Sequence, residues 1–375
     1  MSYLATKIRD VSNVVSGGTP DTSNPNYWDG EINWFTPSEI GNSKYVENSK
    51  RRITSLGYKN CGAKLMSPGS ILLSSRATVG DASISKTECC TNQGFQSLTD
   101  FKCCGQYLYY YLQTYRIHKS LIRRASGSTF LEISNYEVGN TDIFIPDLNI
   151  QEKIAIFLSK IDDRIETQNK IIEKYESLKI GIKESIYLLS KEKEPLEKIL
   201  HEVSEKSTTQ NQYPVLSSTV KGLFLQNEYF DRSIASDNNI GYKIVHKGQI
   251  IISPQNLWMG NLTFNDKYEN GIVSPSYKIY DIDQKYSKKY IYWLLTSKRS
   301  FFNYGLVSEQ GASIVRRNLS IDAFMGLSIP VVKDRNCESK IEKLIDLIEK
   351  KLETEKKRES LLNQQKQFLL SNLFI

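Results

Sequence analysis

Residues 150–194 have the sequence IQEKIAIFLSKIDDRIETQNKIIEKYESLKIGIKESIYLLSKEKE. Apolar residues from Ile154 to Leu189 recur at alternating steps of four and three, which is the period of a coiled coil rather than of an ordinary surface helix. Charged and amide side chains fill the positions between them, so one narrow stripe is apolar. Pro195 lacks an amide hydrogen and is expected to end the helix. The pattern predicts one long helix over residues 150–194 that needs a partner for its apolar seam.

The same pattern returns at the end of the chain, where it predicts a second long helix over residues 334–375. A shift of 187 positions places Ile154 on Ile341 and Ile161 on Ile348. We expect the two helices to pack together, and docking partners to bind them, along a seam made of Ile154, Leu158, Ile161, Ile165, Ile172, Ile341, Ile345, Ile348 and Leu352.

The repeat extends into the sequence that precedes each helix. Gly127 and the pair Ile145-Pro146 match Gly311 and Ile329-Pro330 at a shift of 184, and residues 68–74 resemble residues 247–253. A period near 185 residues has the size of a domain. The alternative is that two coiled-coil helices resemble each other by composition alone, but these matches lie outside the helices and keep their order.

We therefore predict an α+β protein with two similar mixed α/β domains and two long helices. The expected boundaries are residues 1–149 for the first domain, 150–194 for the first helix, 195–333 for the second domain and 334–375 for the second helix.

Composition restricts the class of protein. The 375 residues contain no run of 18 apolar residues, and the mixed polar residues 1–10 predict no signal peptide. Six cysteines without a C-x-x-C motif indicate reduced thiols rather than a zinc site, and three histidines in unrelated contexts do not predict a metal centre. Reduced cysteines favour the cytoplasm.

The charge distribution favours a polyanionic partner. The chain has a formal net charge of +7, of which residues 1–149 carry +2 and residues 195–333 carry +4. Residues 150–194 carry 0 and residues 334–375 carry +1. This distribution fits domains that contact nucleic acid and helices that act as a scaffold.

Several loops of the first domain carry side chains suited to nucleic acid. Arginine can make two contacts to guanine, and asparagine or glutamine can make two to adenine, while basic loops of small residues suit phosphates. The structural alternative for each residue is a turn or a local cap. The candidate DNA-binding residues of this domain are Lys50, Arg51, Arg52, Ser75, Arg76, Thr78, Asn92, Gln93, Arg123, Arg124, Ser126 and Ser128.

The second domain keeps the scaffold segments but has different loops, which is typical of two binding modules with different specificities on one frame. Residues 253–260 replace the loop that contains Arg76, and the Gly-Gly-Thr-Pro loop of residues 17–20 has no counterpart. The candidate DNA-binding residues of this domain are Gln255, Asn256, Lys298, Arg299, Arg316 and Arg317.

We find no catalytic motif in the sequence. A G-x-x-x-x-G-K-[ST] phosphate loop is absent, which argues against an ATP-driven motor. Residues 24–27 are Asn-Pro-Asn-Tyr and are similar to the Asn-Pro-Pro-Tyr motif of amino-methyltransferases, but the third residue differs and no glycine-rich strand-loop-helix unit accompanies it. We expect no catalytic residues, no metal ligands and no cofactor bound by this chain.

The ordered set of motifs resembles the specificity subunit of type I restriction-modification systems over essentially the whole chain. Single motifs are weak, but their order is specific. The segments that carry the resemblance are residues 16–20, Trp34 with residues 38–40, residues 68–80, 92–95, 126–129 and 145–155.

The resemblance implies two target-recognition domains, each of which reads one half of a bipartite DNA site, and antiparallel helices that set the spacer between the halves. It also implies two modification subunits, which would bring S-adenosylmethionine and methylate adenine, and two restriction subunits, which would use ATP and Mg²⁺ to cleave unmodified DNA. Chemistry would then reside in the partners. The alternatives are a coiled-coil adaptor without base readout and an enzyme that acts alone on nucleic acid.

Overall fold

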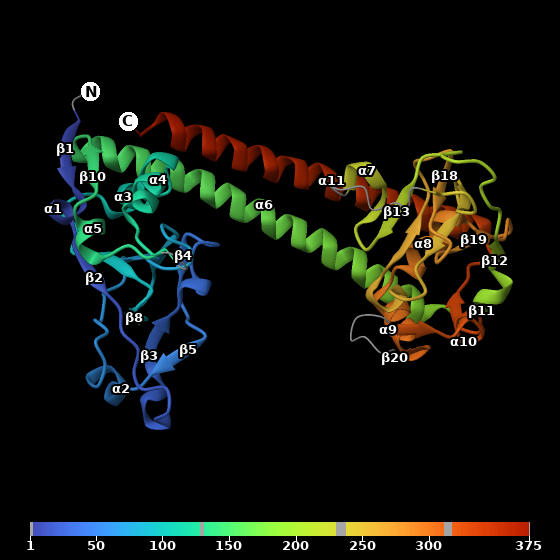
Figure 1. The fold of residues 1–375 in the computed structure, drawn as a ribbon, viewed down its shortest axis with the longest axis horizontal. Coiled ribbons are helices and arrows are strands. Elements are labelled where there is room, and N and C mark those ends of the chain that lie inside the picture. Colours follow the sequence, from blue (N-terminus) through green and yellow to red (C-terminus); the bar gives the residue numbers. More distant parts are fainter. Residues whose placement is uncertain (1–2, 128–130, 230–237, 311–316, 375) are drawn as a thin grey trace. The chain divides into compact units, whose positions relative to one another are not determined.

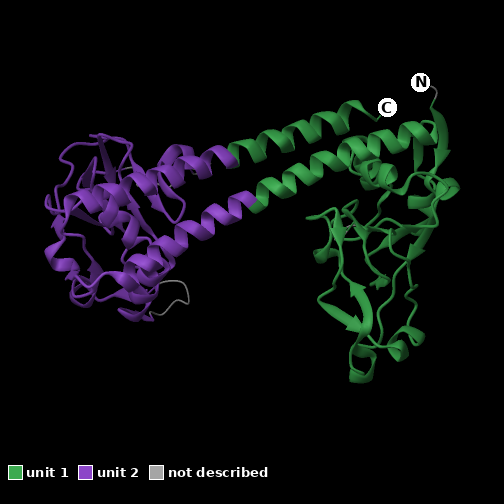
Figure 2. Cartoon of the chain, turned by 180° about the vertical axis from the view of Figure 1, so that it is seen from behind, with its two compact units in different colours: residues 1–170, 356–375 green, residues 171–355 purple. Residues whose placement is uncertain are grey.

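The structure is a computed structural model that describes residues 3–127, 131–229, 238–310 and 317–374. The chain divides into two compact units, which Figure 2 shows in different colours. Unit 1 contains residues 1–170 and 356–375, and unit 2 contains residues 171–355. Each unit therefore combines one globular domain with part of each long helix.

The two predicted long helices are present. Helix α6 spans Leu148–Leu189 and helix α11 spans Arg335–Asn372 (Figure 1). Helix α6 ends before the expected Glu194, because strand β11 (Lys193–Pro195) pairs antiparallel with strand β22 (Ser328–Pro330). The long-range strand pairing, rather than the proline alone, thus fixes the helix end.

Within each unit the two long helices run antiparallel, as the resemblance implied. In unit 1, Leu158 near the start of α6 lies in the same core as Leu370 near the end of α11. In unit 2, Tyr187 near the end of α6 shares a core with Ile345 near the start of α11.

The predicted seam residues face inward. All nine are buried or half-buried: Ile154, Leu158, Ile161, Ile165, Ile172, Ile341, Ile345, Ile348 and Leu352. Leu189, the last apolar residue of the first pattern, is 80% exposed and lies outside the seam, because α6 ends there.

One ion pair in each unit joins the long helices, and a shift of 187 residues places the partners of one pair on those of the other. Asp162 of α6 pairs with Lys366 of α11 at 2.8 Å in unit 1, and Lys179 of α6 pairs with Glu349 of α11 at 2.7 Å in unit 2. The shift places Asp162 on Glu349 and Lys179 on Lys366. The contact is therefore used twice, with the roles of the two helices reversed.

A second repeated contact joins each long helix to its own domain. The Gln151 side chain accepts a hydrogen bond from the backbone N–H of Cys104 at 2.9 Å, and the Glu338 side chain accepts one from Ser287 at the same distance. Gln151 and Glu338 are again 187 positions apart. Cys104 and Ser287 precede the first turn of α3 (Gly105–Leu112) and α8 (Lys288–Leu295). These contacts show that the sequence repeat is a structural repeat, which composition alone would not produce.

Lys366→Asp is expected to destabilise unit 1 by about 2–4 kcal/mol, because it sets a second carboxylate beside Asp162 where both side chains are mostly buried. Lys179→Asp is the matched control in unit 2 and should cost about 1 kcal/mol, because that pair is more exposed. Urea unfolding measures both values, and the exchange Asp162→Lys with Lys366→Asp should restore part of the loss. If Lys366→Asp and the exchanged variant lose the same free energy of unfolding, Asp162 and Lys366 do not stabilise unit 1 through their mutual attraction.

The main sheet of unit 1 packs against the aromatic helix α3. Its strand order is β2-β9-β6-β7-β4, with strands Asn13–Ser16, Gln96–Thr99, Ile71–Leu73, Ala82–Ser85 and Tyr45–Val46. A three-stranded sheet has the order β5-β3-β8, with strands Arg51–Ile53, Trp28–Phe35 and Cys89–Thr91. The remaining elements are β1 (Leu4–Lys7), which pairs with β10 (Asp142–Ile145), and α1 (Ile8–Val11), α2 (Ser55–Lys59), α4 (Tyr115–Arg124) and α5 (Asn135–Gly139).

Unit 2 repeats this main sheet without a fifth strand in the described residues. Its order is β12-β19-β16-β17, with strands Leu200–Val203, Lys278–Ile282, Ile250–Ile252 and Leu262–Phe264. Besides the sheet of β11 with β22, three two-stranded sheets accompany it in the described residues: β13 (Leu216–Thr219) with β14 (Gly222–Leu225), β15 (Lys243–His246) with β18 (Asn270–Val273), and β20 (Ser308–Gln310) with β21 (Arg317–Leu319). The helices are α7 (Gln226–Tyr229), α8, α9 (Lys298–Leu306) and α10 (Ile321–Met325).

The cysteines of unit 1 behave as apolar residues. Cys89 and Cys90 are buried in β8, and burial raises the pKa of the Cys89 thiol to about 11 and that of Cys90 to about 12. All six cysteines are free thiols. The two buried thiols are therefore protonated and unreactive near neutral pH.

Candidate nucleic-acid interface

Three loops that are far apart in the sequence meet in unit 1. They contain residues 16–20, 75–80 and 92–95, and we call them the loop cluster. The backbone N–H of Gly18 donates to the carbonyl of Thr91 at 2.8 Å, and the hydroxyl of Thr19 donates to the side-chain oxygen of Gln93 at 2.5 Å. The N–H of Ser75 donates to the carbonyl of Gly94 at 2.8 Å. These bonds fix the three loops to one another.

Glycine is required where the first loop crosses the third. A Cβ atom on Gly17 would lie 1.9 Å from the carbonyl oxygen of Asn92, and a Cβ on Gly18 would lie 2.4 Å from the backbone nitrogen of Ala63. Both neighbours are backbone atoms that cannot rotate away. The indole N–H of Trp34 donates to the carbonyl of Gly18 at 2.9 Å and holds the loop from the other side.

Arg76 lies on the exposed part of the loop cluster and pairs with Glu132. Two guanidinium nitrogens donate to one carboxylate oxygen, at 2.6 and 3.2 Å, and the side chains are 51% and 39% exposed. Glu132 is held in turn by two backbone hydrogen bonds with Ser126. The pair orients the guanidinium while leaving half of the Arg76 side chain exposed.

The neighbouring candidates differ in exposure. Gln93 and Ser126 are exposed, whereas Ser75 is fully buried and its hydroxyl has no partner among the described residues. The Asn92 side chain accepts from the N–H of Gly94 at 2.9 Å and so caps its own turn. Thr78 lies within 3.2 Å of the Ser74 hydroxyl in the same loop. Only side chains at the surface can reach DNA without rearrangement.

In the basic triplet of residues 50–52, Arg51 and Arg52 lie on β5 and Lys50 directly precedes it. The guanidinium of Arg51 stacks 3.5 Å from the ring centroid of Trp28, while Arg52 donates to the Asn48 side chain at 3.0 Å. The backbone N–H of Lys50 donates to Glu39 at 2.6 Å. The Arg51 stack preorganises a cation at the surface.

A further pair lies at the end of α4. Arg124 pairs with Glu137 at 3.0 Å and Asp142 at 3.4 Å, so its charge is already neutralised. Arg123 is exposed. Ser128 lies outside the described residues.

In unit 2 the candidates group around Trp258. The guanidinium of Arg317 lies 4.1 Å from the Trp258 ring centroid, and its backbone N–H donates to the carbonyl of Gln255 at 3.1 Å. The loop after β16 and strand β21 are thereby joined. The side-chain oxygen of Asn256 is buried without a partner among the described residues. Arg316 lies outside the described residues.

Lys298 and Arg299 are not part of that group. They occupy the first turn of α9, where the Arg299 guanidinium lies 5.9 Å from the ring of Tyr187 on α6. Arg317 instead donates to the carbonyl of Gly305 near the other end of α9. The described basic candidate residues of unit 2 therefore lie in two separate groups.

Sequence reasoning missed the residues that hold these side chains. Thr19, Trp28, Glu132 and Trp258 each contact a candidate residue, but only folding brings them together. The one readable signal was an aromatic residue close in sequence to a polar loop, as at Trp258.

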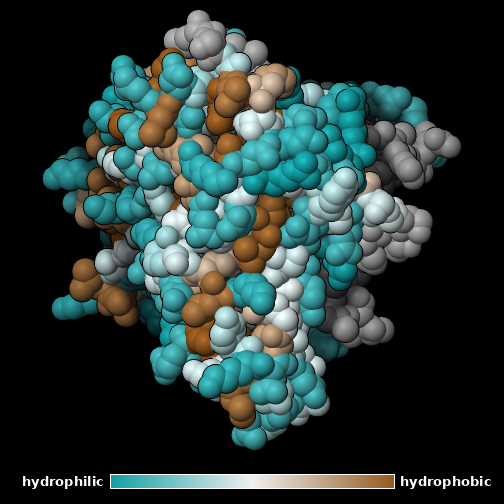
Figure 3. Space-filling view, turned by 90° about the vertical axis from the view of Figure 1, so that its left-hand side faces the viewer, coloured by the Kyte–Doolittle hydropathy of each residue, from teal (hydrophilic) through white to brown (hydrophobic). Residues whose placement is uncertain are grey.

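Among the described residues no group of three or more histidine, cysteine, aspartate or glutamate residues could hold a metal ion, and no helix is long and apolar enough to cross a membrane. The face drawn in Figure 3 is largely hydrophilic, and its hydrophobic patches are interrupted by hydrophilic residues.

Known proteins match part of the chain by sequence. Residues 5–177 match the family model described as type I restriction modification DNA specificity domain. The specificity subunit of the type I restriction enzyme MjaIX of Methanocaldococcus jannaschii is 38% identical over 174 residues, which cover 45% of this chain and 40% of that one. The putative MjaX specificity subunit of the same organism is 31% identical over 124 residues, 32% of this chain and 29% of that one. The matches thus span less than half of these relatives.

Two solved structures share the fold of the whole chain. The S subunit of the type I restriction-modification system of M. genitalium has a TM-score of 0.57 at 15% identity, covering 100% of this chain and 96% of that one. A chain from a structure concerning complex assembly and conformational transition of the type I R-M system has a TM-score of 0.62 at 11% identity, covering 100% and 97%. These likenesses confirm the predicted fold class.

Proposed function

We propose that the chain is the DNA sequence-specificity subunit of a type I restriction-modification complex, because residues 5–177 match the model of the type I restriction modification DNA specificity domain. The observation that carries the proposal is a repeated scaffold with unequal loops. The main sheets share one strand order and both long helices make the same contacts, while the loops after β6 and β16 present different side chains.

Each unit reads one half of a bipartite site in this proposal. The loop after β6 presents Arg76, which suits guanine, and the exposed Gln93 beside it suits adenine. The loop after β16 presents Gln255, with Arg317 attached to it through the backbone. Different side chains at matching places would give two different half-sites.

The helices set the spacer and dock two modification subunits. Phe157 of α6 and Leu344 of α11 are 48% and 43% exposed, and they are 187 positions apart. Two matching apolar positions on a repeated scaffold would give two equivalent docking sites, and therefore two copies of the same partner. Restriction subunits would join the same assembly.

Chemistry lies with the partners. The modification subunits would bind S-adenosylmethionine and methylate adenine, and the restriction subunits would use ATP and Mg²⁺. The chain itself would bind no cofactor and catalyse no step. We place the complex in the cytoplasm, where it meets cellular and incoming DNA.

Phe157→Asp is expected to lower the number of bound modification subunits from two to one, because a carboxylate cannot be buried in an apolar contact without a partner. Phe157→Asp with Leu344→Asp should release both. Native mass spectrometry of the co-expressed complex counts the subunits. Leu178→Asp is the control, since Leu178 is equally exposed on α6 but its counterpart at the 187-residue shift is Gln365. Unchanged stoichiometry in the double variant would place the docking sites elsewhere.

The function itself is tested by co-expression with the cognate modification subunit and genome-wide mapping of methylated adenines. We expect methylation at one two-part sequence with a fixed gap, and none without this chain. Methylation that does not depend on the chain would overturn the proposal, and methyl transfer by the purified chain alone would show that it is itself an enzyme.

A further inference from the structure

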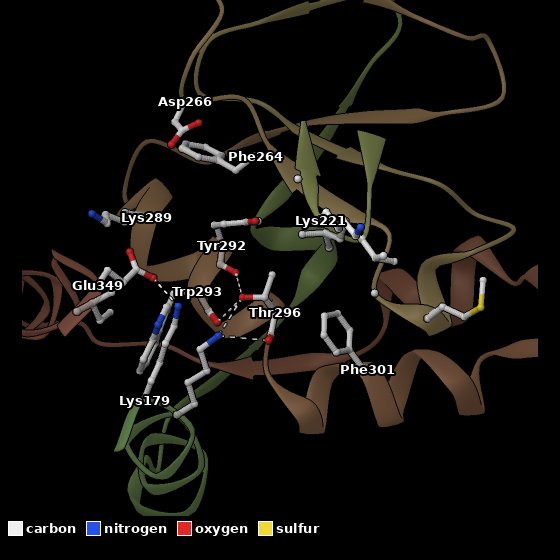
Figure 4. A pocket seen from close by; sticks show the side chains of 17 residues that line it. Lys179, Lys221, Phe264, Asp266, Lys289, Tyr292, Trp293, Thr296, Phe301 and Glu349 are labelled. Carbon is white, nitrogen blue, oxygen red and sulfur yellow. Dashed lines mark hydrogen bonds and ion pairs between the residues drawn. The ribbon is translucent and has the colours of Figure 1, made fainter. Parts of the chain in front are cut away.

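Unit 2 contains a pocket of about 640 Å³, and none of the candidate DNA-binding residues lines it. Its walls come from α6, α8, α9, α11, β17 and the turn between β13 and β14. Six charged residues line it: Lys179, Lys183, Lys221, Lys289, Asp266 and Glu349. In Figure 4, Lys179, Lys289 and Glu349 lie on one side and Lys221 and Phe301 on the other. The pocket therefore carries more positive than negative charge.

Lys183 brings an ammonium group into this pocket without a counter-ion. It is only 7% exposed, and its Nζ donates to the carbonyl and the hydroxyl of Thr296 at 3.2 and 3.0 Å. Both acceptors are neutral, and within the described residues no carboxylate pairs with it. The carboxylate of Glu349 is taken by Lys179 at 2.7 Å. The site thus has a buried positive charge that an anion would neutralise.

The electrostatics of Lys183 agree with this geometry. Burial, and to a smaller extent the charge of Lys179, lower the pKa of its ammonium to about 7, while Glu349 opposes the shift. Lys221, Lys289 and Asp266 also face the pocket. Near neutral pH a fraction of the Lys183 amine is therefore unprotonated, unlike an ordinary lysine.

The remaining wall is aromatic. Phe264 and Tyr292 stack with ring centroids 5.4 Å apart, and Figure 4 shows Phe301 across the pocket from Tyr292. Trp293 lies under the ammonium of Lys183 at 5.0 Å, and its indole N–H is buried without a partner among the described residues. Flat apolar surfaces beside an unpaired cation suit a ring that carries an anion.

The corresponding place in unit 1 holds a smaller pocket of about 480 Å³, which Lys44, Tyr45 and Lys86 help to line. Strand β4 runs along β7 there, and its Tyr45 ring lies 5.0 Å from the ammonium of Lys44 and 5.6 Å from that of Lys86. Lys44 also donates to the hydroxyl of Tyr110, the counterpart of Trp293. The sheet of unit 2 ends at β17 in the described part of the chain. The pocket of unit 1 thus has an aromatic ring and lysines of its own on its wall, whereas the pocket of unit 2 is larger and has no such strand in the described residues.

A second difference between the units concerns the buried lysine. At the 187-residue shift, Lys183 corresponds to Leu370, which is an ordinary apolar core residue of unit 1. The scaffold therefore does not need a charge at this position.

We propose that this pocket binds an organic anion that consists of a flat aromatic ring and a phosphate or carboxylate group. The ring packs against Phe264 and Phe301, the anionic group binds Lys221, and the Lys183 amine lies beside both.

Pyridoxal 5′-phosphate is a suitable probe because it has both parts and an aldehyde. Its aldehyde carbon forms an imine with an unprotonated lysine amine and releases water. Borohydride then delivers hydride to the imine carbon and solvent protonates the nitrogen, which leaves a stable secondary amine. Peptide mapping after reduction, on the full chain at pH 7.5, compares labelling of Lys183 with that of Lys160, an exposed lysine on the same helix.

We expect Lys183 to be labelled at least about tenfold faster than Lys160, despite its burial, because more of its amine is unprotonated. Pyridoxine 5′-phosphate, which lacks the aldehyde, should protect Lys183 but not Lys160. Pyridoxine without phosphate should not protect. Lys221→Ala, a change at an exposed turn, should weaken the protection severalfold, and Lys160→Ala should leave it unchanged.

Three results would overturn the proposal. If Lys183 is labelled no faster than Lys160, the Lys183 amine is not accessible to the probe. Equal protection by pyridoxine with and without phosphate would show an apolar site rather than an anion site. Protection that Lys221→Ala leaves intact would remove that lysine from the binding site.

Discussion

Gly17→Ala is expected to destabilise unit 1 by about 2–4 kcal/mol and to abolish recognition of one half-site. The added methyl group would lie 1.9 Å from the carbonyl oxygen of Asn92 and 2.5 Å from that of Thr91. The loop of residues 16–20 must therefore move away from the loop of residues 92–95. Because Gln93 and Arg76 belong to the same loop cluster, their side chains would lose their fixed positions. Urea unfolding measures the stability. Binding to DNA that carries one or both half-sites measures the recognition.

Gly62→Ala is the matched control. A Cβ atom on Gly62 meets nothing within 4 Å, so the same change should shift stability by less than about 0.5 kcal/mol and leave DNA binding unaltered. If Gly17→Ala is as stable as the unaltered chain and binds both half-sites, the contacts within the loop cluster do not position the DNA-binding side chains.

A coordinated insertion of seven residues in both long helices is expected to lengthen the spacer of the recognised site by about three base pairs. Seven residues add about 10.5 Å of helix, and one base pair spans about 3.4 Å. The insertion points follow Lys170 and Glu355, where the chain passes from one unit to the other, so the contacts within each unit are retained. Copies of residues 164–170 and 349–355 keep the seam in phase.

Mapping of methylated adenines reads the new spacer directly. Both half-sites should stay the same, although affinity should fall because longer helices also change the rotation between the half-sites. Insertion in α6 alone is the control and should abolish activity, since it shifts Lys179 away from Glu349. An active complex with an unchanged spacer would show that the helices do not measure the gap.

Local periodicity was enough to predict the architecture. The 3.5-residue period identified both helices and their seam, because packing of two helices requires a continuous apolar stripe. The repeat predicted two similar domains, and the matching contacts of Gln151 and Glu338 confirm it at the level of single hydrogen bonds. The end of α6 at Leu189 could not be predicted, because it depends on pairing between β11 and β22.

The candidate site was predictable only in outline. Glycine-rich and polar loops can be recognised from sequence, but the partners of their side chains are distant. Arg76 pairs with Glu132 across 56 positions, and Arg317 stacks on Trp258 across a comparable separation. Ser75 directly precedes Arg76 yet is fully buried, since its exposure depends on which face of the sheet it meets.

The central claim is that each domain reads its own half of the DNA site. Exchange of residues 1–149 for those of a relative with a different known site, followed by mapping of methylated adenines, tests it most directly. We predict that one half of the recognised sequence changes to that of the relative while the other half and the gap stay the same. A change in both halves, or in neither, would contradict the account.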